Sequence, residues 1–502
     1  MLFHSYQFIV VFLPLCFLGF ATVVHRWGWQ AGILWLAASS IIFYGQWSVL
    51  HAVVLVASIV VNYAFALLII KARQRRKRGF TPLMLAVTCN LGLLAYFKYT
   101  NFLIDNFNSV FAASAPHLQI AYVVGISFFT FIQLGVLFEI YSGQLTSLRF
   151  SHFFLMGSFF PCVTAGPIVL QKEMMPQFAH ERRALFNPLR IAVAVTVFGI
   201  GLFKKLVLAD GIAPYADVAF NGVAAGGAID AGGAWIGAIA YTLQLYFDFS
   251  GYSDMAVGIG YLFGFRLPLN FNSPLKAASI IDFWRRWHMT MTRFFTTYLY
   301  TPLGICLMRR AVKARLGKTQ RFLLAVATPV VITFVLAGVW HGAGWTFVVF
   351  GLIHGFALAI NHAWREAGLP ALPRPVGWLL TMSVVVAGLV FFRAENLGVA
   401  LTMLAGMLGV APPPPSGAAL IAVAATPALL LIFGLMTIAL LFPNTQELMR
   451  NHQIGADPLA REGGRHAWVW RPSRRWAIAT CLLFAVSLGL MAGETTFVYY
   501  QF

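Results

Sequence analysis

The chain has 502 residues, of which 60% are hydrophobic and only 10% are charged, and its formal net charge is +19. A water-soluble protein of this size needs a charged surface, and about 25% of the residues of an average soluble domain are charged. The composition therefore excludes a soluble multidomain protein, a disordered chain and a nucleic-acid-binding module. It indicates an integral membrane protein.

Apolar runs of about twenty residues, the length that spans a bilayer as a helix, recur along the whole chain. They lie at 8–24, 31–46, 50–70, 81–97, 119–141, 190–208, 235–264, 323–339, 345–361, 377–392, 419–441 and 476–492. Some are short or interrupted by glycine, so they predict about ten to twelve spans. They are longer than barrel strands and do not alternate in polarity. We therefore expect an all-α membrane protein, with one domain over residues 1–502.

Basic segments between the apolar runs predict the orientation. The densest is KARQRRKR at 71–78, and 309–321 and 450–475 are also basic. Under the positive-inside rule these segments are cytoplasmic, which places both termini outside. The positive charge is thus explained as a topology signal and a contact with membrane lipid, not as a nucleic-acid site. Three lysines fall on the unexpected side: Lys98, Lys204 and Lys205.

The five cysteines are scattered, and no two form a CxxC pair. We therefore expect no disulfide framework and no metal cluster. We also expect no metal site and no tightly bound cofactor elsewhere in the chain. The sequence also contains no GxSxG elbow, no P-loop and no HExxH motif. Asp248 and Asp254 are six residues apart, so they lie on different faces of a helix, and buried hydrogen bonding explains them better than a catalytic pair.

One segment, residues 266–321, is too polar and too charged to cross lipid as a helix. Here aromatic residues alternate with arginines, as in DFWRRWHMTMTRFFTTYLY. The pattern favours short amphipathic helices at the membrane interface or folded into the protein. Backbone of this kind at membrane depth must be surrounded by protein or water, which indicates a cavity.

His341 is the first candidate for catalysis, in the sequence VWHGAGW between two apolar runs. Gly342 and Gly344 would break the helix there and allow another group to approach the backbone closely. Trp340 and Trp345 would enclose the imidazole, and a neutral histidine can accept a proton from a hydroxyl group. The alternative is an interfacial histidine beside membrane-belt tryptophans.

His288 is the second candidate, at the end of FWRRWH. With Arg285 and Arg286 it could bind an anionic substrate, or the three residues could anchor the segment to lipid headgroups. His354 follows His341 by thirteen residues, more than three helical turns, so the two should not pair directly along one continuous helix.

These blocks resemble the membrane-bound O-acyltransferase (MBOAT) superfamily, specifically its AlgI-like branch. The resemblance runs almost end to end, and the blocks DFWRRWH and WHGAGW, in this order and about fifty residues apart, are its most specific part. Further matching blocks are GISFFTF, FFPCVTAGPIV, GLFKKLVLAD, YFDFSGYSDMAVGIGYLFGF, LPLNFNSP, YLYTPLG, FFRAENL, FPNTQELM and YYQF. The sequence departs from the branch at EIYSG and at Cys162, away from the histidines.

The resemblance implies a ring of tilted helices, with re-entrant or interfacial helices, around a central tunnel. It also implies that His341 is the catalytic histidine and His288 the second family histidine. We expect the surrounding residues to bind donor and substrate; they are Asp282, Trp284, Arg285, Arg286, Trp287, Trp340, Gly342 and Trp345.

The implied activity is transfer of an acetyl group from cytoplasmic acetyl-CoA across the bacterial inner membrane. The acceptor would be an extracytoplasmic polysaccharide, most simply an alginate-like exopolysaccharide, with a periplasmic SGNH-hydrolase-like partner. Acetyl-CoA is a polyanion, and the arginines near His288 would face its phosphates. Two alternatives stay open here: D-alanyl transfer to teichoic acid, as in the related DltB-like branch, and a non-enzymatic exporter of polysaccharide or lipid-linked sugar.

Overall fold

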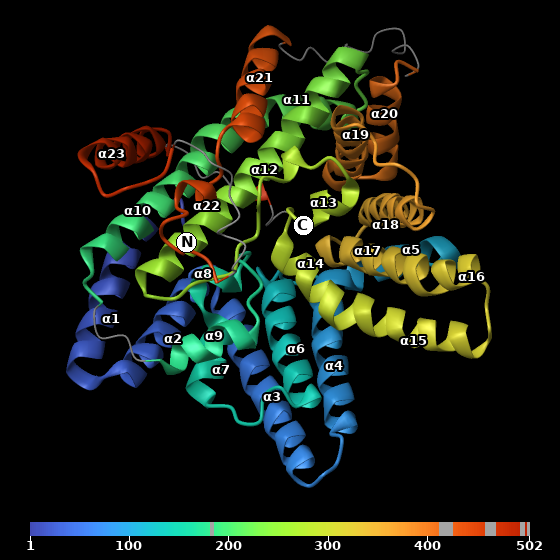
Figure 1. Ribbon diagram of the computed structural model, residues 1–502. Coiled ribbons are helices and arrows are strands. Elements are labelled where there is room, and N and C mark those ends of the chain that lie inside the picture. Colours follow the sequence, from blue (N-terminus) through green and yellow to red (C-terminus); the bar gives the residue numbers. More distant parts are fainter. Residues whose placement is uncertain (181–184, 411–424, 457–467, 492–496, 499–502) are drawn as a thin grey trace. The chain divides into compact units, whose positions relative to one another are not determined.

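The computed structural model describes all residues except 181–184, 411–424, 457–467, 492–496 and 499–502 (Figure 1). In the part of the chain that it describes, every regular element is a helix, which confirms the all-α prediction. The chain divides into two compact units. Unit 1 comprises Met1–Phe203, Gly251–Leu269 and Thr445–Gln501, and unit 2 comprises Lys204–Ser250 and Asn270–Asn444 with Phe502.

Unit 1 is built mainly from apolar helices, whose connections range from single residues to the long segment between α5 and α6. They are η1 (Gln7–Phe12), α1 (Leu13–Trp27), α2 (Trp29–Gly45), α3 (Val49–Gln74), α4 (Phe80–Leu94), η2 (Ala95–Tyr99), α5 (Thr100–Phe111), α6 (Ile126–Ser142), α7 (Phe150–Ser158), α8 (Phe160–Val163), α9 (Gln171–Ala179), α10 (Pro188–Phe203), α22 (Thr445–Leu448) and α23 (Arg474–Gly489). Helix α6 packs against α3 and α4 and is buried on nearly all sides.

Side-chain amides join these three helices in their apolar surroundings. The Asn62 amide of α3 donates to Gln133 Oε1 of α6 at 2.6 Å and to Asn90 Oδ1 of α4 at 3.1 Å. Asn90 donates back to Asn62 Oδ1 at 2.6 Å. Inside a membrane the lipid is as apolar as the helices, so the hydrophobic effect does not drive helices together. Hydrogen bonds of this kind help to hold them together instead.

Unit 2 contains the remaining helices and all the candidate site residues. They are η3 (Lys204–Ala209), α11 (Asp210–Ala224), η4 (Pro274–Lys276), α13 (Ile280–Trp284), α14 (Met289–Phe295), η5 (Thr296–Tyr300), α15 (Thr301–Lys313), α16 (Lys318–Phe322), η6 (Leu323–Ala327), α17 (Thr328–His341), α18 (Trp345–Glu366), α19 (Arg374–Arg393), α20 (Leu397–Met407) and α21 (Ala425–Leu441). Helix α12 (Ala231–Leu262) contributes its first part to unit 2 and its last part to unit 1.

Seven helical stretches are long and apolar enough to cross a bilayer among the residues searched. They are Gln7–Trp27, Val49–Gln74, Phe80–Phe111, Pro188–Ala224, Lys318–His341, Trp345–Glu366 and Arg374–Arg393. Shorter apolar helices occur at α6, α20 and α21. Seven of the predicted apolar runs therefore coincide with such stretches, and the prediction of a multi-pass membrane protein is confirmed.

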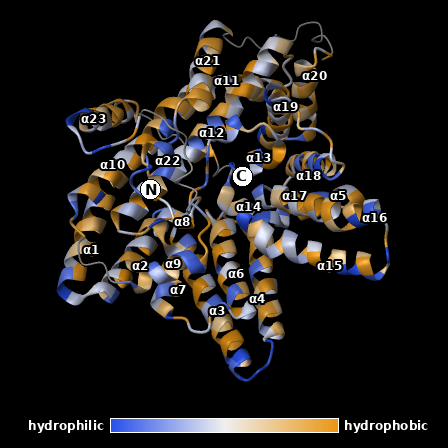
Figure 2. Ribbon diagram, in the orientation of Figure 1, coloured by the Kyte–Doolittle hydropathy of each residue, from blue (hydrophilic) through white to orange (hydrophobic). Residues whose placement is uncertain are grey.

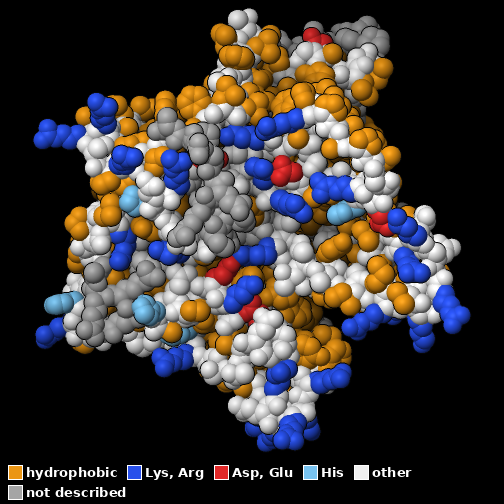
Figure 3. Space-filling view, viewed as in Figure 1, with side chains coloured by type: hydrophobic (Ala, Val, Ile, Leu, Met, Phe, Trp, Pro, Cys, Tyr) orange, Lys and Arg blue, Asp and Glu red, His pale blue; other side chains and the backbone are white. Residues whose placement is uncertain are grey.

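The basic segment at 71–78 lies at the connection between α3 and α4. Hydropathic colouring shows both helices as largely apolar and their connection as hydrophilic (Figure 2). Lysine and arginine side chains gather at this tip, at the bottom of the space-filling view (Figure 3). Such a sharp change from apolar helix to basic turn is typical of a membrane boundary.

The segment 266–321, for which the sequence predicts short amphipathic helices, contains short helices only in its first half. Helix α13 has five residues and α14 has seven, and α15 follows η5 without a break. Because η5 also follows α14 directly, residues 289–313 form one helical stretch of 25 residues, so the prediction of short helices is wrong for this part. This stretch is not among those that are both long and apolar enough to cross a bilayer.

Lys205, one of the three lysines on the unexpected side, is explained by its ion pairs. Its ammonium group is 1% exposed and lies 2.8 Å from a carboxylate oxygen of Asp210 and 2.8 Å from one of Asp248. It is therefore a buried ion-pair residue and not a loop anchor. The same contact confirms that Asp248 has a buried structural role.

Candidate active site

His288 lies in the turn that joins α13 to α14, in a backbone conformation that is uncommon for a residue with a side chain. Its φ is +42°, in the left-handed region. Two backbone hydrogen bonds hold this turn against the non-helical residues 270–272. Met289 donates to the Asn270 carbonyl at 2.9 Å, and Asn272 donates to the Arg286 carbonyl at 2.9 Å. Strain of this kind persists only where the surroundings determine the conformation, and it is frequent at functional sites.

The His288 ring is fully buried, and its Nδ1 lies 3.3 Å from Asn270 Oδ1. The Thr290 hydroxyl donates to the same oxygen at 2.6 Å. Because an amide oxygen can only accept hydrogen bonds, Nδ1 of a neutral His288 must carry the proton that it shares with Asn270 Oδ1. Nε2 then carries the lone pair. Burial lowers the pKa of His288 to about 3, so the ring is neutral at physiological pH.

His341 is the last residue of α17, and α18 begins four residues later at Trp345. The Phe347 ring fills the space in which a Cβ on Gly342 would lie, so only glycine fits there. Farther along the two helices, Gly338 and Gly351 leave room for close backbone contact between α17 and α18. The predicted break at Gly342 and the close approach of another group are confirmed, and together they place His341 at a tight elbow.

The two histidines lie close together inside unit 2. Their ring centroids are 6.4 Å apart, and His341 is only 6% exposed. The Trp340 ring lies beside both histidine rings. Its centroid is 4.9 Å from that of His341 and 6.1 Å from that of His288. The structure therefore brings together two residues that the sequence could only treat separately.

Three phenylalanines that the sequence did not single out complete the enclosure. Phe392 and Phe350 lie 5.1 Å and 6.1 Å from the His341 ring, and Phe249 lies 4.7 Å from the His288 ring. The block FFRAENL contains Phe392, and the block YFDFSGYS contains Phe249, so both lay within sequence that already carried the resemblance. An apolar wall excludes water and strengthens polar interactions between groups inside it.

The two tryptophans of FWRRWH are buried in unit 2. Trp284 and Trp287 are 4% and 7% exposed. The Trp284 indole donates to His354 Nδ1 at 3.3 Å, and Trp287 packs against Phe283. Their role in binding donor stays a prediction.

The charged residues of the segment are more accessible. Asp282 pairs with Arg286 at 2.9 Å, four residues along the chain, and both are about one-third exposed. Arg285 is exposed. Trp345 is 55% exposed at the start of α18. An exposed arginine next to an ion-paired one can receive an anionic group from solution, which is compatible with the predicted role of Arg285.

Among the described residues, no group of three or more histidine, cysteine, aspartate or glutamate side chains could hold a metal ion. The described site consists of two histidines, the hydrogen-bonding groups of Asn270 and Thr290, and an aromatic wall.

The model of the membrane-bound O-acyltransferase family matches residues 137–403, more than half of the chain and a range that contains both histidines. The chain belongs to this family. The O-acyltransferase is thus an enzyme, which confirms the acyl-transfer hypothesis over the exporter alternative.

The O-acyltransferase is similar to several bacterial proteins over most of its length. It is 39% identical to a peptidoglycan O-acetyltransferase of Helicobacter pylori over 440 residues, 82% of this chain and 80% of that protein. It is 37% identical to a probable alginate O-acetylase AlgI of Azotobacter vinelandii over 412 residues, 81% of this chain and 78% of that protein. It is 29% identical to a teichoic acid D-alanyltransferase of Streptococcus thermophilus over 290 residues, 54% of this chain and 68% of that protein.

Proposed function

We propose that this O-acyltransferase moves an acetyl group from cytoplasmic acetyl-CoA to an extracytoplasmic cell-surface polysaccharide, in the inner membrane of a bacterium. The observation that carries the proposal is the buried pair of His288 and His341, 6.4 Å apart within an aromatic wall. Relatives named as O-acetyltransferases cover about four-fifths of the chain, whereas the D-alanyltransferase covers about half. The wider coverage favours acetyl over D-alanyl transfer.

In the proposed reaction His341 acts as the general base. A hydroxyl oxygen of the acceptor attacks the thioester carbonyl carbon, and His341 takes the hydroxyl proton. The tetrahedral intermediate then collapses, the carbon–sulfur bond breaks, and His341 returns the proton to the departing sulfur. The O-acetyl ester and free coenzyme A are the products, so protons and electrons balance.

His288 orients one of the reacting groups in this proposal. Its ring is neutral and its Nδ1 proton is directed to Asn270, so Nε2 can accept a hydrogen bond. Exposed Arg285 and its neighbour Arg286 would attract the phosphates of the donor on the cytoplasmic side. The acceptor hydroxyl would arrive from the opposite side, either from the polysaccharide or from a periplasmic SGNH-hydrolase-like partner that passes the acetyl group on.

An alginate-like exopolysaccharide is the first candidate acceptor, and peptidoglycan is the second. The alginate O-acetylases support the first, and the Helicobacter pylori peptidoglycan O-acetyltransferase supports the second. The two glycans differ in charge and sugar, but both present hydroxyl groups on the outer side of the membrane.

The test measures O-acetyl groups on each purified surface glycan in cells with the wild-type protein, with His341→Ala and with His117→Ala. His117 is an exposed histidine in unit 1 that bonds to Asp105, so it controls for loss of a histidine outside the site. We expect His341→Ala to abolish acetylation of one glycan while inserting normally, and His117→Ala to retain it. Full acetylation in the His341→Ala strain would refute the proposal, and D-alanyl ester in place of acetyl would select the alternative.

A further inference from the structure

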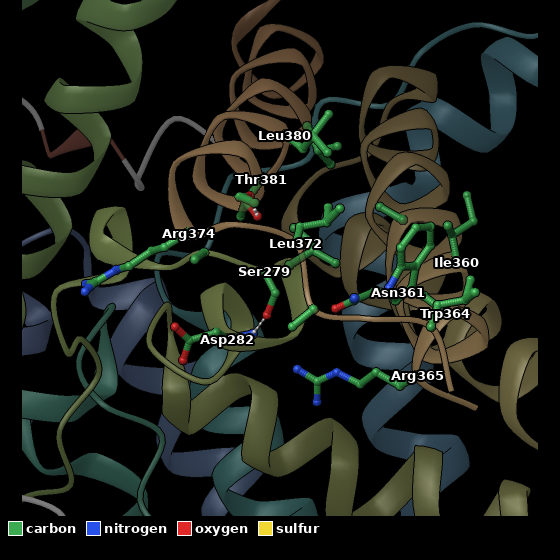
Figure 4. A pocket seen from close by; sticks show the side chains of 17 residues that line it. Ser279, Asp282, Ile360, Asn361, Trp364, Arg365, Leu372, Arg374, Leu380 and Thr381 are labelled. Carbon is green, nitrogen blue, oxygen red and sulfur yellow. Dashed lines mark hydrogen bonds between the residues drawn. The ribbon is translucent and has the colours of Figure 1, made fainter. Parts of the chain in front are cut away.

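A pocket of about 620 Å³ lies in unit 2, where the end of α18, the start of α19 and the turn before α13 meet. Figure 4 shows it from close by, with Asn361, Trp364 and Arg365 on one side and Leu380 and Thr381 at the far end. The pocket does not include either candidate catalytic histidine. It is therefore separate from the reacting groups.

The connection between α18 and α19 closes one side of this pocket. The Trp364 indole donates to the Pro370 carbonyl at 2.9 Å, which holds the connection against the end of α18. In the orientation that the basic segments predict, this connection faces the cytoplasm. The pocket would then open at the cytoplasmic boundary of the membrane.

Two arginines line this pocket without any ion-pair or hydrogen-bond partner for their side chains among the described residues: Arg365, in the last turn of α18, and Arg374, in the first turn of α19. The buried Oδ1 of Asn361, one helical turn before Arg365, also lacks a hydrogen-bond partner there. The one carboxylate in the lining, Asp282, is already paired with Arg286. Figure 4 shows the Arg365 side chain reaching along the pocket, whereas Arg374 extends away from it at the start of α19. The polar end of the pocket thus offers the uncompensated charge of Arg365 and one acceptor oxygen.

Apart from Ser279 and Thr381, the rest of the lining is apolar, and several of its side chains are exposed. Ile360, Leu372 and Leu380 are 67%, 43% and 54% exposed, although α18 and α19 are both long enough to span a bilayer. Ala357 and Val384 continue this apolar surface away from the arginines, about one turn farther along each helix. Exposed apolar side chains on membrane-spanning helices face acyl chains, so the pocket is continuous with the lipid.

We propose that this pocket binds one phospholipid, with the phosphate at Arg365 and an acyl chain along the apolar wall between α18 and α19. Arg374, at the outer rim, adds to the positive field that attracts the headgroup. Asn361 accepts a hydrogen bond from a hydroxyl or ammonium group of the headgroup. Basic residues at the membrane boundary above an apolar cleft have the charge and polarity pattern of a phospholipid. The proposal does not depend on which acyl donor or acceptor the enzyme uses.

A lipid fits this pocket better than a soluble phosphate compound such as coenzyme A. Most of the lining is aliphatic, with Ser279, Asn361 and Thr381 as its uncharged polar side chains. An acyl chain can pack along such a lining, whereas a nucleotide would leave most of its polar groups without partners there. The side opening toward the lipid also gives a phospholipid direct access from the bilayer, without crossing water.

The experiment measures lipid binding by native mass spectrometry of the full-length, delipidated protein in a non-ionic detergent. The probe is phosphatidylglycerol, and the competitors are diacylglycerol, which lacks the phosphate, and free coenzyme A, which lacks acyl chains. The variants are Arg365→Gln/Arg374→Gln and, as a charge-matched control, Arg309→Gln/Arg310→Gln in α15, where both arginines are exposed and outside the pocket. Ala357→Trp tests the apolar wall.

We expect one phosphatidylglycerol to bind about tenfold more weakly to Arg365→Gln/Arg374→Gln than to the wild type, and the control pair to bind as the wild type does. Ala357→Trp should also weaken binding, and neither competitor should displace the lipid. Equal binding by the double variant and the wild type would overturn the proposal. Displacement by coenzyme A would overturn it too, because the pocket would then belong to the soluble donor. Since the arginines are exposed, their replacement should leave the unfolding temperature unchanged, which keeps the binding result interpretable.

Discussion

The ring of Phe347 occupies the position that a Cβ atom on Gly342 would need. Phe347 in turn packs against Phe392 at 5.2 Å, and Phe392 packs against His341 at 5.1 Å. The absence of a side chain at Gly342 therefore lets Phe347 take the position in which it supports Phe392 against the His341 ring.

We expect Gly342→Ala to displace Phe347 and loosen the contact of Phe392 with His341. Overpacking of this kind costs about 1–3 kcal/mol, and a displaced catalytic group lowers the rate further. The measurement is the unfolding temperature in detergent together with acyl transfer in membrane vesicles. Gly344→Ala is the matched control, since a Cβ at Gly344 would make only ordinary contacts, 3.5 Å from the Phe347 ring. Equal behaviour of the two variants would contradict the argument.

Asn270 is expected to act as a positioning residue for His288. Asn270→Ala removes the acceptor of the Nδ1 proton, so the ring can change tautomer and lose its orientation. We expect kcat to fall about tenfold or more with little change in KM for the donor. Thr290→Val removes only the second hydrogen bond to Asn270 Oδ1 and should have a smaller effect. A rise in KM at constant kcat in Asn270→Ala would point to substrate binding instead.

The stability of the protein should depend on His288 in acid. Because burial lowers the pKa of His288 to about 3 from 6.5, the unfolded state takes up a proton at a higher pH than the folded state does. The stabilisation from the neutral ring is therefore complete above about pH 6.5 and is lost as the pH falls toward 3, by about 1.4 kcal/mol per pH unit. Unfolding temperatures between pH 7 and pH 4 should fall more steeply for the wild type than for His288→Gln. Parallel curves would show that His288 does not contribute.

The Lys205–Asp248 ion pair should contribute to stability mainly through the cost of breaking it. Lys205→Met leaves the fully buried Asp248 carboxylate without its cation and should destabilise the protein by about 3–5 kcal/mol. Lys205→Met/Asp248→Asn removes both charges and should recover a large part of that loss. Thermal unfolding of the two single variants and the double variant forms the test. Additive losses in the double variant would argue against direct coupling of the pair.

Arg285 should affect the donor rather than the chemical step. Its side chain is exposed, and it lies three residues before His288. We expect Arg285→Gln to raise KM for acetyl-CoA several-fold at low salt, with kcat nearly unchanged and with the difference reduced at high salt. Arg309→Gln, an exposed arginine in α15, is the control and should leave KM unchanged. A fall in kcat alone would place Arg285 in the chemistry.

The sequence alone determined that this is a membrane protein, that it is helical and which family it belongs to. Hydrophobic runs of bilayer length are local features, so α3, α18 and α19 could be predicted without any contact being known. The two histidines could also be selected, because glycines and tryptophans beside His341 and arginines beside His288 are local features too.

Only the tertiary structure decided which residues meet. His288 and His341 are about fifty residues apart, Phe249 precedes His288 by 39 residues and Phe392 follows His341 by 51, yet all four share one wall. Charge counting left Lys205 unexplained on the unexpected side of the membrane, because a buried lysine and a loop lysine look the same in sequence until Asp248 is seen 2.8 Å away. Hydropathy is a property of neighbours along the chain, whereas side-chain contacts depend on how helices cross, and that depends on the packing of the whole unit.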